Sequence, residues 1–444
     1  MTPPLPPKPE PRPDRVSLWG HLRAFRRDIL SSQPARLYRA WMAEFRTPFF
    51  ESYLCNDPAL VRRVLDERPQ DFPKSDRVTE GLRPLLGRSV FVTNGEEWLR
   101  QRRIIDPAFE GGRLREVFPA ILAAAEAAVA RMGEGEVEIE LAASHAAADV
   151  IFRTLFSIPI EDRVAQAVFH AFRAYQRSAP ILNLGAFLRL PTWVPRLHRG
   201  ATRRSAREIR GLIAGLTAER AAAIAAGTAP QDLATRIMTT PDPTTGRPFG
   251  TAEMVDQVAI FFLAGHETSA SALGWALYLL ATHPEVQERV AAEAESLRPE
   301  FGTLAGLRLT RDVFREALRL YPPVPMLVRE TLHAEEFRGR RVRRGAQVVI
   351  SPWHLHRHER LWDRPDAFDP DRWAGEVPKG GYLPFSRGAR VCPGAGFAML
   401  EGTLILAHLV RAFRFEALPD RVPVPVAHLT VRARDGIWLR VSRR

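Results

Sequence analysis

Residues 385–398 read Phe385-Ser-Arg-Gly-Ala-Arg-Val-Cys392-Pro-Gly-Ala-Gly-Phe-Ala398, and they place one cysteine in a glycine-bearing loop directly before an apolar helix. Gly388 and Gly394 predict tight backbone turns, because glycine adopts conformations that a residue with a Cβ resists. The N-terminus of the following helix puts partial positive charge beside the sulfur, which favours the thiolate. The stretch therefore predicts a shielded thiolate that serves as a ligand.

The spacing Phe-x-x-Gly-x-Arg-x-Cys-x-Gly in this loop resembles the signature of the cytochrome P-450 family, and the resemblance covers about residues 35 to 440. It implies that Cys392 is the thiolate ligand of haem b and that Arg390 reaches a haem propionate. It also assigns cofactor contacts to the loop residues Phe385, Gly388 and Gly394. Taken alone, the loop leaves a buried free cysteine in a turn as the alternative.

The composition fits a large globular domain. The chain has 444 residues, of which 45% are hydrophobic, so it is long enough to bury a substantial core. Its two cysteines, Cys55 and Cys392, exclude a disulfide framework and favour a reducing cytoplasm. Cys55 lies in an apolar run and is expected to be a small core residue.

The N-terminal segment differs from the rest of the chain. Prolines crowd its first thirteen residues, so we expect residues 1–33 to be disordered and residues 34–444 to form a single domain. This segment resembles neither a signal peptide nor an anchor. The most membrane-like stretch, 258–281, contains His266-Glu267-Thr268, which would be costly in lipid, so we expect no transmembrane anchor.

The charge balance is basic. Lys and Arg number 63 against 51 Asp and Glu, a net charge of +12 that favours an acidic partner. The arginines are spread along the chain and no basic helix concentrates them, which argues against nucleic acid. A docking face for an acidic electron-transfer protein is the better interpretation, with plain solvated surface as the alternative.

The pattern of elements predicts a mainly α fold with a small β portion, at about 48–60 and 324–355. Residues 111–238 have the spacing of several long helices, and 311–320 reads as a helix that ends before Pro322-Pro323. A short helix is expected around 34–45. This map matches the cytochrome P-450 fold, in which a long central helix lies over haem and the cysteine loop beneath it.

A second motif, Ala264-Gly-His-Glu-Thr-Ser269, lies inside an otherwise apolar helix. Burying an acid and a hydroxyl there costs several kcal/mol unless partners compensate. In the family, an acid and alcohol pair at this place delivers protons to dioxygen, which assigns that role to Glu267 and Thr268. The alternative is a polar kink that its own helix satisfies.

Two further sets of residues are weak signals singly, but their order along the chain resembles that of the family. Glu316-Ala-Leu-Arg319, followed by Pro370-Asp-Arg372-Trp373, resembles the buried Glu-Arg-Arg network of the family, with Asp371 and Trp373 as conservative departures. Trp98 and Arg102 share a helix face, and the resemblance assigns them, with Arg329, to the haem propionates.

Two motifs suggest binding sites that we do not expect. The alternating histidines His354, His356 and His358 could suggest a metal site, but the family has a structural segment here. Gly394-Ala-Gly396 lacks the third glycine and the strand of a dinucleotide fingerprint. Nothing in the chain resembles a reductase domain, so electrons must come from a separate protein.

The resemblance implies a monooxygenase that activates dioxygen with two electrons and inserts one oxygen atom into a lipophilic molecule such as a fatty acid or terpenoid. The implied donor is an acidic ferredoxin or flavodoxin-like protein with its NAD(P)H reductase. The alternatives are a haem-thiolate sensor without turnover and a peroxide-driven enzyme. The segments implied to line the substrate pocket contain Phe91, Val92, Ala264, Val324, Met326 and Leu327.

Overall fold

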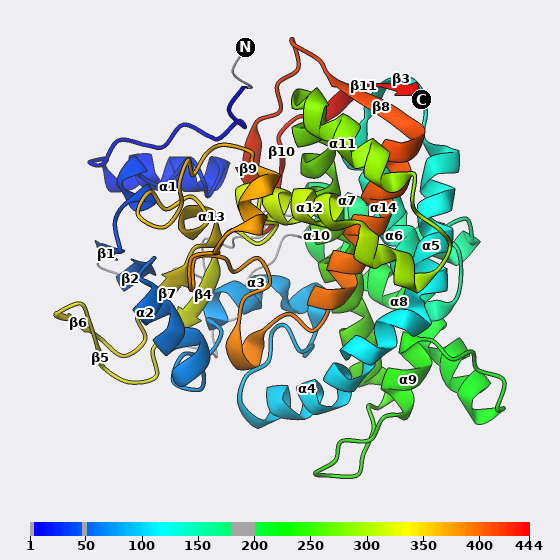
Figure 1. The fold of residues 1–444 in the computed structure, drawn as a ribbon. Coiled ribbons are helices and arrows are strands. Elements are labelled where there is room, and N and C mark those ends of the chain that lie inside the picture. Colours follow the sequence, from blue (N-terminus) through cyan, green and yellow to red (C-terminus); the bar gives the residue numbers. More distant parts are fainter. Residues whose placement is uncertain (1–3, 47–50, 179–199) are drawn as a thin grey trace.

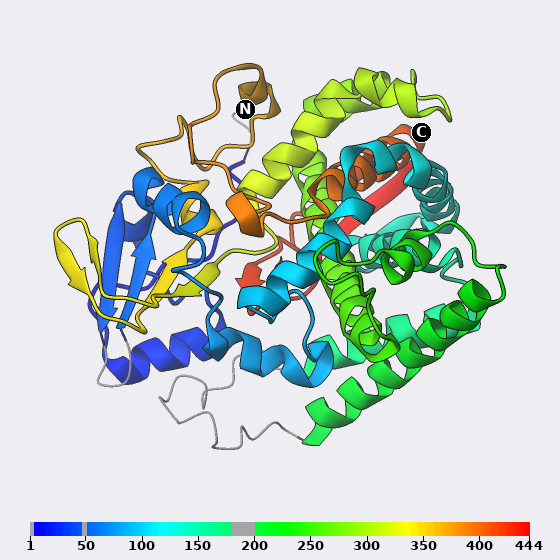
Figure 2. The same ribbon diagram turned by 90° about the horizontal axis from the view of Figure 1, so that it is seen from below.

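A computed structural model describes residues 4–46, 51–178 and 200–444. Helices fill one side of the molecule and a smaller region rich in strands occupies the other, as Figures 1 and 2 show. The helices of the larger side are α3 (Asp76–Leu86), α4 (Gly95–Phe109), α5 (Leu114–Arg131), α6 (Ile139–Phe156), α7 (Arg163–Ser178), α8 (Gly200–Ala225), α9 (Leu233–Thr239), α10 (Thr251–Thr282), α11 (Pro284–Ala294), α12 (Arg308–Leu320) and α14 (Ala395–Ala412).

Helix α10 is the centre of this arrangement. Most of its 32 residues are buried, and it packs against α6, α8, α12 and α14. A helix that is apolar on nearly every face is expected to be enclosed by its neighbours. Helix α12 ends where the sequence predicts, because a proline after Tyr321 cannot continue the ladder of hydrogen bonds.

The strand-rich side is built on a four-stranded sheet in the order β1-β2-β7-β4. Strands β2 and β7 run parallel, with Tyr53 opposite Val348, and the other two pairs are antiparallel. The strands are β1 (Met42–Arg46), β2 (Glu51–Cys55), β4 (Leu327–Glu330) and β7 (Gln347–Ile350), with the adjoining hairpin of β5 (Glu335–Phe337) and β6 (Arg340–Val342).

Two smaller sheets close the helical side. One has the order β3-β11-β8, and the other is a hairpin that reaches α10 through Ser271, whose hydroxyl donates to the carbonyl of Val431 at 2.5 Å. Their strands are β3 (Gly135–Glu138), β8 (Phe413–Ala417), β9 (Pro425–Ala427), β10 (Val431–Ala433) and β11 (Trp438–Arg443).

The remaining elements are short. Asp57 caps α2 through a side-chain bond to the N–H of Ala59, as the sequence Asn56-Asp57-Pro58 suggests. These elements are α2 (Pro58–Arg62), α13 (Pro352–Leu355), the π-turn η2 (Arg63–Glu67), and the 3₁₀ turns η1 (Ala35–Tyr38), η3 (Gly111–Arg113), η5 (Phe301–Gly306), η6 (Pro370–Ala374) and η7 (Gly388–Arg390).

Two expectations for the N-terminal region are wrong. Residues 18–27, expected to be disordered, form helix α1 (Leu18–Arg27), and the hydroxyl of Tyr321 donates to the carbonyl of Pro7 at 2.8 Å. Residues 42–45, expected to belong to a helix, lie in β1, because pairing with β2 overrides local propensity. The prolines of the N-terminal segment suggest disorder, but they give no sign that Tyr321, far along the chain, donates to the carbonyl of one of them.

One described helix, α14, is long and apolar enough to cross a membrane, but it is mostly buried inside the protein. Its apolar residues join the main core beneath α10. A second core lies in the strand-rich side and includes Cys55, Tyr53 and Val348. Cys55 is fully buried, and burial raises the pKa of its thiol to about 12, so the expectation of a core cysteine is confirmed.

Candidate functional site

The cysteine loop lies between η6 and α14 and is closed by its own backbone. The N–H of Cys392 donates to the carbonyl of Phe385 at 2.9 Å. Gly388 has φ +69°, and a Cβ there would meet the carbonyl oxygen of Leu65 at 2.1 Å, so this position requires glycine. Phe385 packs against the main core and anchors the start of the loop.

Gly394 lies in the turn that the sequence predicts, which the N–H of Ala395 closes by donating to the carbonyl of Cys392 at 3.3 Å. Its φ is −84°, and a Cβ there would touch the sulfur of Cys392 at an ordinary 3.9 Å. Its backbone N–H donates to that sulfur. The expectation of a tight turn is therefore right for both glycines, but only Gly388 needs the conformational freedom of glycine, whereas Gly394 also contributes a hydrogen-bond donor.

Cys392 keeps accessible surface as a residue, yet its thiol lies among protein atoms, and burial raises the thiol pKa. The Gly394 N–H and the charge of Arg102 oppose this shift without reversing it. The sequence predicts that the helix terminus lowers the thiol pKa. In the structure, desolvation raises the pKa by more than these groups lower it. A cationic metal centre bound to the sulfur would supply the missing stabilisation of the thiolate.

Three cations lie over the indole of Trp98, which is 2% exposed, and a fourth adjoins them. The guanidinium of Arg390 lies 4.3 Å from the ring centroid, the ammonium of Lys74 lies at 5.7 Å and the guanidinium of Arg102 at 5.9 Å. Arg329 forms a β-bridge with Lys74. We call Lys74, Arg102, Arg329 and Arg390 the cation cluster.

The cation cluster is electrostatically strained. The pKa of Lys74 lies well below its usual range, because of burial first and then of Arg390, Arg329 and Arg102. Burial lowers the pKa of Arg329 to about 10, with a further contribution from Arg390. Burial also lowers that of Arg390 to about 10, with a contribution from Arg102.

The guanidinium groups of this cluster fit an anionic ligand. Buried Nε of Arg329 and buried Nε and Nη1 of Arg390 have no hydrogen-bond partner in the described part of the chain. Arg102 is partly paired, with Asp106 Oδ2 at 2.9 Å and the carbonyl of Val391 at 2.8 Å, and the second bond ties α4 to the cysteine loop. Two carboxylates of a haem would satisfy these donors.

Sequence reasoning found three members of the cation cluster and missed Lys74. Lys74 stands in a loop after Pro73, and its Nζ donates to the carbonyls of Val90 and Thr93 at 2.6 Å and 3.1 Å. No local motif marks it, since its bridge with Arg329 joins segments far apart along the chain.

The acid and alcohol of α10 point to different sides of the helix, as consecutive residues do. The Thr268 hydroxyl donates to the carbonyl of Ala264 one turn earlier, and both residues keep accessible surface. Glu267 accepts from the hydroxyl of Thr430. At Gly265 a Cβ would lie 2.4 Å from Ile151, so glycine permits close packing of α6 on α10.

Glu316, Arg319 and Arg372 form one contact network. Arg319 and Glu316 are fully buried and joined at 2.8 Å and 2.9 Å, and Arg372 donates to the same carboxylate at 2.9 Å. Arg319 also donates to the carbonyls of His356, Pro365 and Ala367. The network therefore fixes the segment that precedes the cysteine loop to α12.

The histidines next to this network are engaged in structural bonds. His356 accepts from the N–H of Leu383 at 2.8 Å and contacts the carbonyl of Arg319 at 3.2 Å, while His354 contacts the hydroxyl of Ser351 at 2.8 Å. Burial lowers the pKa of both rings to about 3, so both are neutral. Within the described ranges no three His, Cys, Asp or Glu residues are grouped as metal ligands.

The residues expected to line a substrate pocket divide into two groups. Val92 is 3% exposed in the main core, and Leu327 packs against the core of the strand-rich side. Phe91, Ala264, Val324 and Met326 keep accessible surface, and so does Leu327. Val92 is thus engaged in packing, whereas the other five are available to a ligand.

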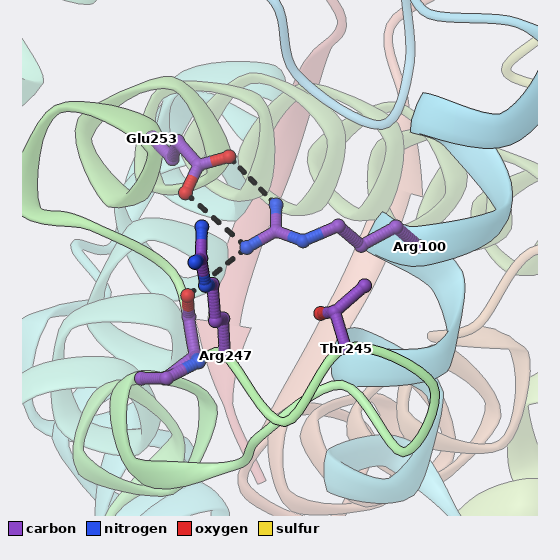
Figure 3. Close-up of a pocket in the computed structure, with 5 residues that line it drawn as sticks. Arg100, Thr245, Arg247 and Glu253 are labelled. Atoms are coloured by element: carbon purple, nitrogen blue, oxygen red, sulfur yellow. Dashed lines mark hydrogen bonds and ion pairs between the residues drawn. The ribbon is translucent and has the colours of Figure 1, made fainter.

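A separate pocket of about 570 Å³ lies between α4 and the start of α10 (Figure 3). Arg100 crosses it and pairs with Glu253 at 2.7 Å, while its other nitrogen donates to the carbonyl of Pro248 at 3.0 Å. Glu253 in turn caps α10 through the N–H of Gly250. These bonds describe a structural junction, and none of the predicted site residues lines it.

The family model for cytochrome P-450 matches residues 11–438. The chain is 34% identical over 424 residues to cyclooctat-9-en-7-ol 5-monooxygenase of Streptomyces melanosporofaciens, over 92% of this chain and 89% of that protein. It is 30% identical over 446 residues to pentalenene oxygenase of Streptomyces avermitilis, over 97% of each. The crystal structure of the cytochrome P-450DA heme domain superposes with TM-score 0.81 at 26% identity, over 99% of this chain and 98% of that one.

This chain belongs to the cytochrome P-450 family. It is a haem-thiolate monooxygenase with haem b as its cofactor, and it acts on a lipophilic small molecule. Its reaction requires dioxygen and a redox partner. The expectations of family, fold class, activity and cofactor are therefore confirmed.

Proposed function

We propose that Cys392 ligates haem iron through its thiolate and that the cation cluster, with Trp98, holds the haem propionates. The observation that supports this most strongly is the set of buried guanidinium nitrogens of Arg329 and Arg390 that lack partners in the described ranges. Haem bound to a thiolate supplies the activation of dioxygen and the oxidation of carbon. The chain's own residues position the groups and move the protons.

Thr268 is proposed to orient a proton donor toward the place where dioxygen would react, and Glu267 to supply the proton. Thr268 is suited to the task because its hydroxyl lies on the accessible face of α10 and bonds the carbonyl of Ala264, which orients it. Burial raises the pKa of Glu267, so this carboxyl holds its proton more tightly than an ordinary glutamate does.

Substitution of Thr268 by alanine tests this assignment. Haem and substrate binding should persist, while the ratio of product formed to electron donor consumed should fall severalfold, because reducing equivalents escape as peroxide. Thr282→Ala, at the end of α10, where the hydroxyl donates to the carbonyl of Tyr278 at 3.2 Å, is the matched loss of a hydroxyl. An unchanged ratio in Thr268→Ala would leave Thr268 as a residue of the helix kink alone.

We infer that the substrate is a cyclic terpenoid. The support is that two relatives aligned over nine tenths or more of the chain are named for oxygenation of cyclooctat-9-en-7-ol and pentalenene. The accessible apolar residues Phe91, Val324 and Met326 suit such a skeleton.

A substrate-binding titration tests the terpenoid class. Cyclic terpene hydrocarbons and terpene alcohols should displace iron-bound water and shift the Soret band to the high-spin position, whereas saturated fatty acids should shift it less. A panel in which only the fatty acids produce the shift would overturn the terpenoid assignment and leave the monooxygenase activity intact.

The redox partner is proposed to be a separate acidic ferredoxin or flavodoxin-like protein with an NAD(P)H reductase. The net charge of +12 and the exposed Val391 beside Cys392, with Arg387 in the same loop, support a docking face there. A cytoplasmic location is proposed from the two unpaired cysteines.

A further inference from the structure

A second cavity, of about 390 Å³, lies against the side of α10 that carries Glu267. Its walls come from the start of α6, the end of α7, the middle of α10 and the β10 strand with the turn that follows. The lining extends from exposed Arg434 and Asp435 inward to His266, which is 4% exposed. A polar passage therefore connects the protein surface with the acid of α10.

Glu267 lines this cavity from α10. Its carboxylate accepts from the hydroxyl of Thr430. Thr268, the next residue, lies on the other side of the helix with Ala264. Glu267 is thus placed between a cavity that reaches solvent and the helix face proposed to meet dioxygen.

A second carboxyl, Glu140 in the first turn of α6, lines the same cavity. The N–H of Ala433 donates to it, and the charge of Arg432 acts on both Glu140 and Glu267. The two carboxylates also repel each other. The hairpin of β9 and β10 therefore brings an arginine to two acids that are far apart along the chain.

The protonation of Glu140 changes near neutrality. Burial raises its pKa to about 7, Arg432 and the Ala433 N–H oppose that rise, and Glu138 and Glu267 add to it. The charged and titratable groups facing the cavity are Glu138 of β3, Arg173 of α7, His266 of α10, Arg432 of β10, and Arg434 and Asp435 beyond it. Burial also lowers the pKa of His266 to about 4, so its ring is neutral and contributes no charge.

We propose that Glu140 collects protons at the outer part of this cavity and passes them through water to Glu267, an inference that rests on the proposed role of Glu267. The cavity is polar and has room for several waters that bond such groups. Each turnover consumes two protons with two electrons; one oxygen atom enters the substrate and the other leaves as water. Glu140 gives its proton to Glu267 and regains one from solvent, so its own charge is restored.

The experiment measures product formation by the holoenzyme across about pH 6 to about pH 9, and the solvent deuterium isotope effect on it. In the parent enzyme the rate should fall as pH rises through about 7, because Glu140 then stays ionised. Glu140→Gln should lower the rate roughly tenfold and remove that inflection. The carbonyl-complex spectrum and the substrate-induced spin shift should be unchanged.

Two control variants distinguish a role of Glu140 in proton transfer from a purely structural role. Glu140→Asp keeps a carboxyl and should retain the inflection, while Glu336→Gln, exposed on β5, should match the parent enzyme. A Glu140→Gln enzyme with parental rate and pH profile, beside an impaired Glu267→Gln enzyme, would overturn the relay and leave the role of Glu267 standing. If Glu267→Gln is also unimpaired, the proposed role of Glu267 fails and the relay fails with it.

Discussion

The two cysteines differ in their surroundings rather than in their chemistry. Cys55 is fully buried among apolar residues of the strand-rich side, whereas Cys392 has a backbone donor from Gly394 and accessible surface. Substitution of Cys392 by serine should abolish the strongly red-shifted Soret band of the reduced carbonyl complex, because that band requires thiolate ligation. Cys55→Ser should leave the band in place. The opposite pair of spectra would refute the assignment of the ligand.

Lys74 is the residue whose role only the fold reveals. Burial and then the charges of three arginines lower the pKa of its ammonium, so a nearby anion would stabilise its charge. Lys74→Met should therefore weaken the hold on the haem propionates and speed the transfer of haem to apomyoglobin by severalfold. The exposed Lys379→Met is the matched control and should transfer haem at the parental rate. Equal rates for both variants would exclude Lys74 from the propionate site.

At the scale of an element, the cysteine loop depends on one glycine and not on the other. Gly388→Ala should prevent stable haem binding, because the left-handed backbone costs about 1–2 kcal/mol and the new Cβ overlaps the carbonyl oxygen of Leu65. Gly394→Ala adds only an ordinary contact with the sulfur and retains the N–H donor. The yield of the thiolate carbonyl complex in the two variants checks this order, and equal yields would contradict it.

Some of the helices and strands could be predicted from the sequence and others could not. Helices α10 and α12 and the cysteine loop were predictable, because apolar runs, a proline stop and glycine spacing act locally. Strand β1 was not, since its pairing with β2 overrides local propensity. The same holds for Lys74 and Glu140, which reach the site only through Arg329 and the β10 strand. Local patterns predict elements and motifs, whereas cavities and charge clusters arise from packing.

At the scale of the whole molecule, ion pairs partly neutralise the arginines that give the net positive charge. Arg387, expected to contact an acidic donor, lies in the cysteine loop but pairs with Asp66 at 2.7 Å and is 38% exposed. Its charge is therefore partly offset. The exposed Val391 adds an apolar centre to this face. A donor docked here would meet a surface whose attraction combines the net charge of the molecule with a few local arginines.

This arrangement predicts how reduction responds to salt and charge. The rate of first reduction by an acidic ferredoxin should fall as salt rises, because charges are screened over roughly 10 Å at about 0.1 M salt. Arg387→Glu should slow reduction further, since it reverses one charge and leaves Asp66 without its cation. Arg440→Glu makes the same change in net charge on β11, at the end of the molecule away from α4 (Figure 1), and should slow it less. Equal slowing by both variants would assign the attraction to net charge alone, and a rate indifferent to salt and to both variants would remove electrostatic docking.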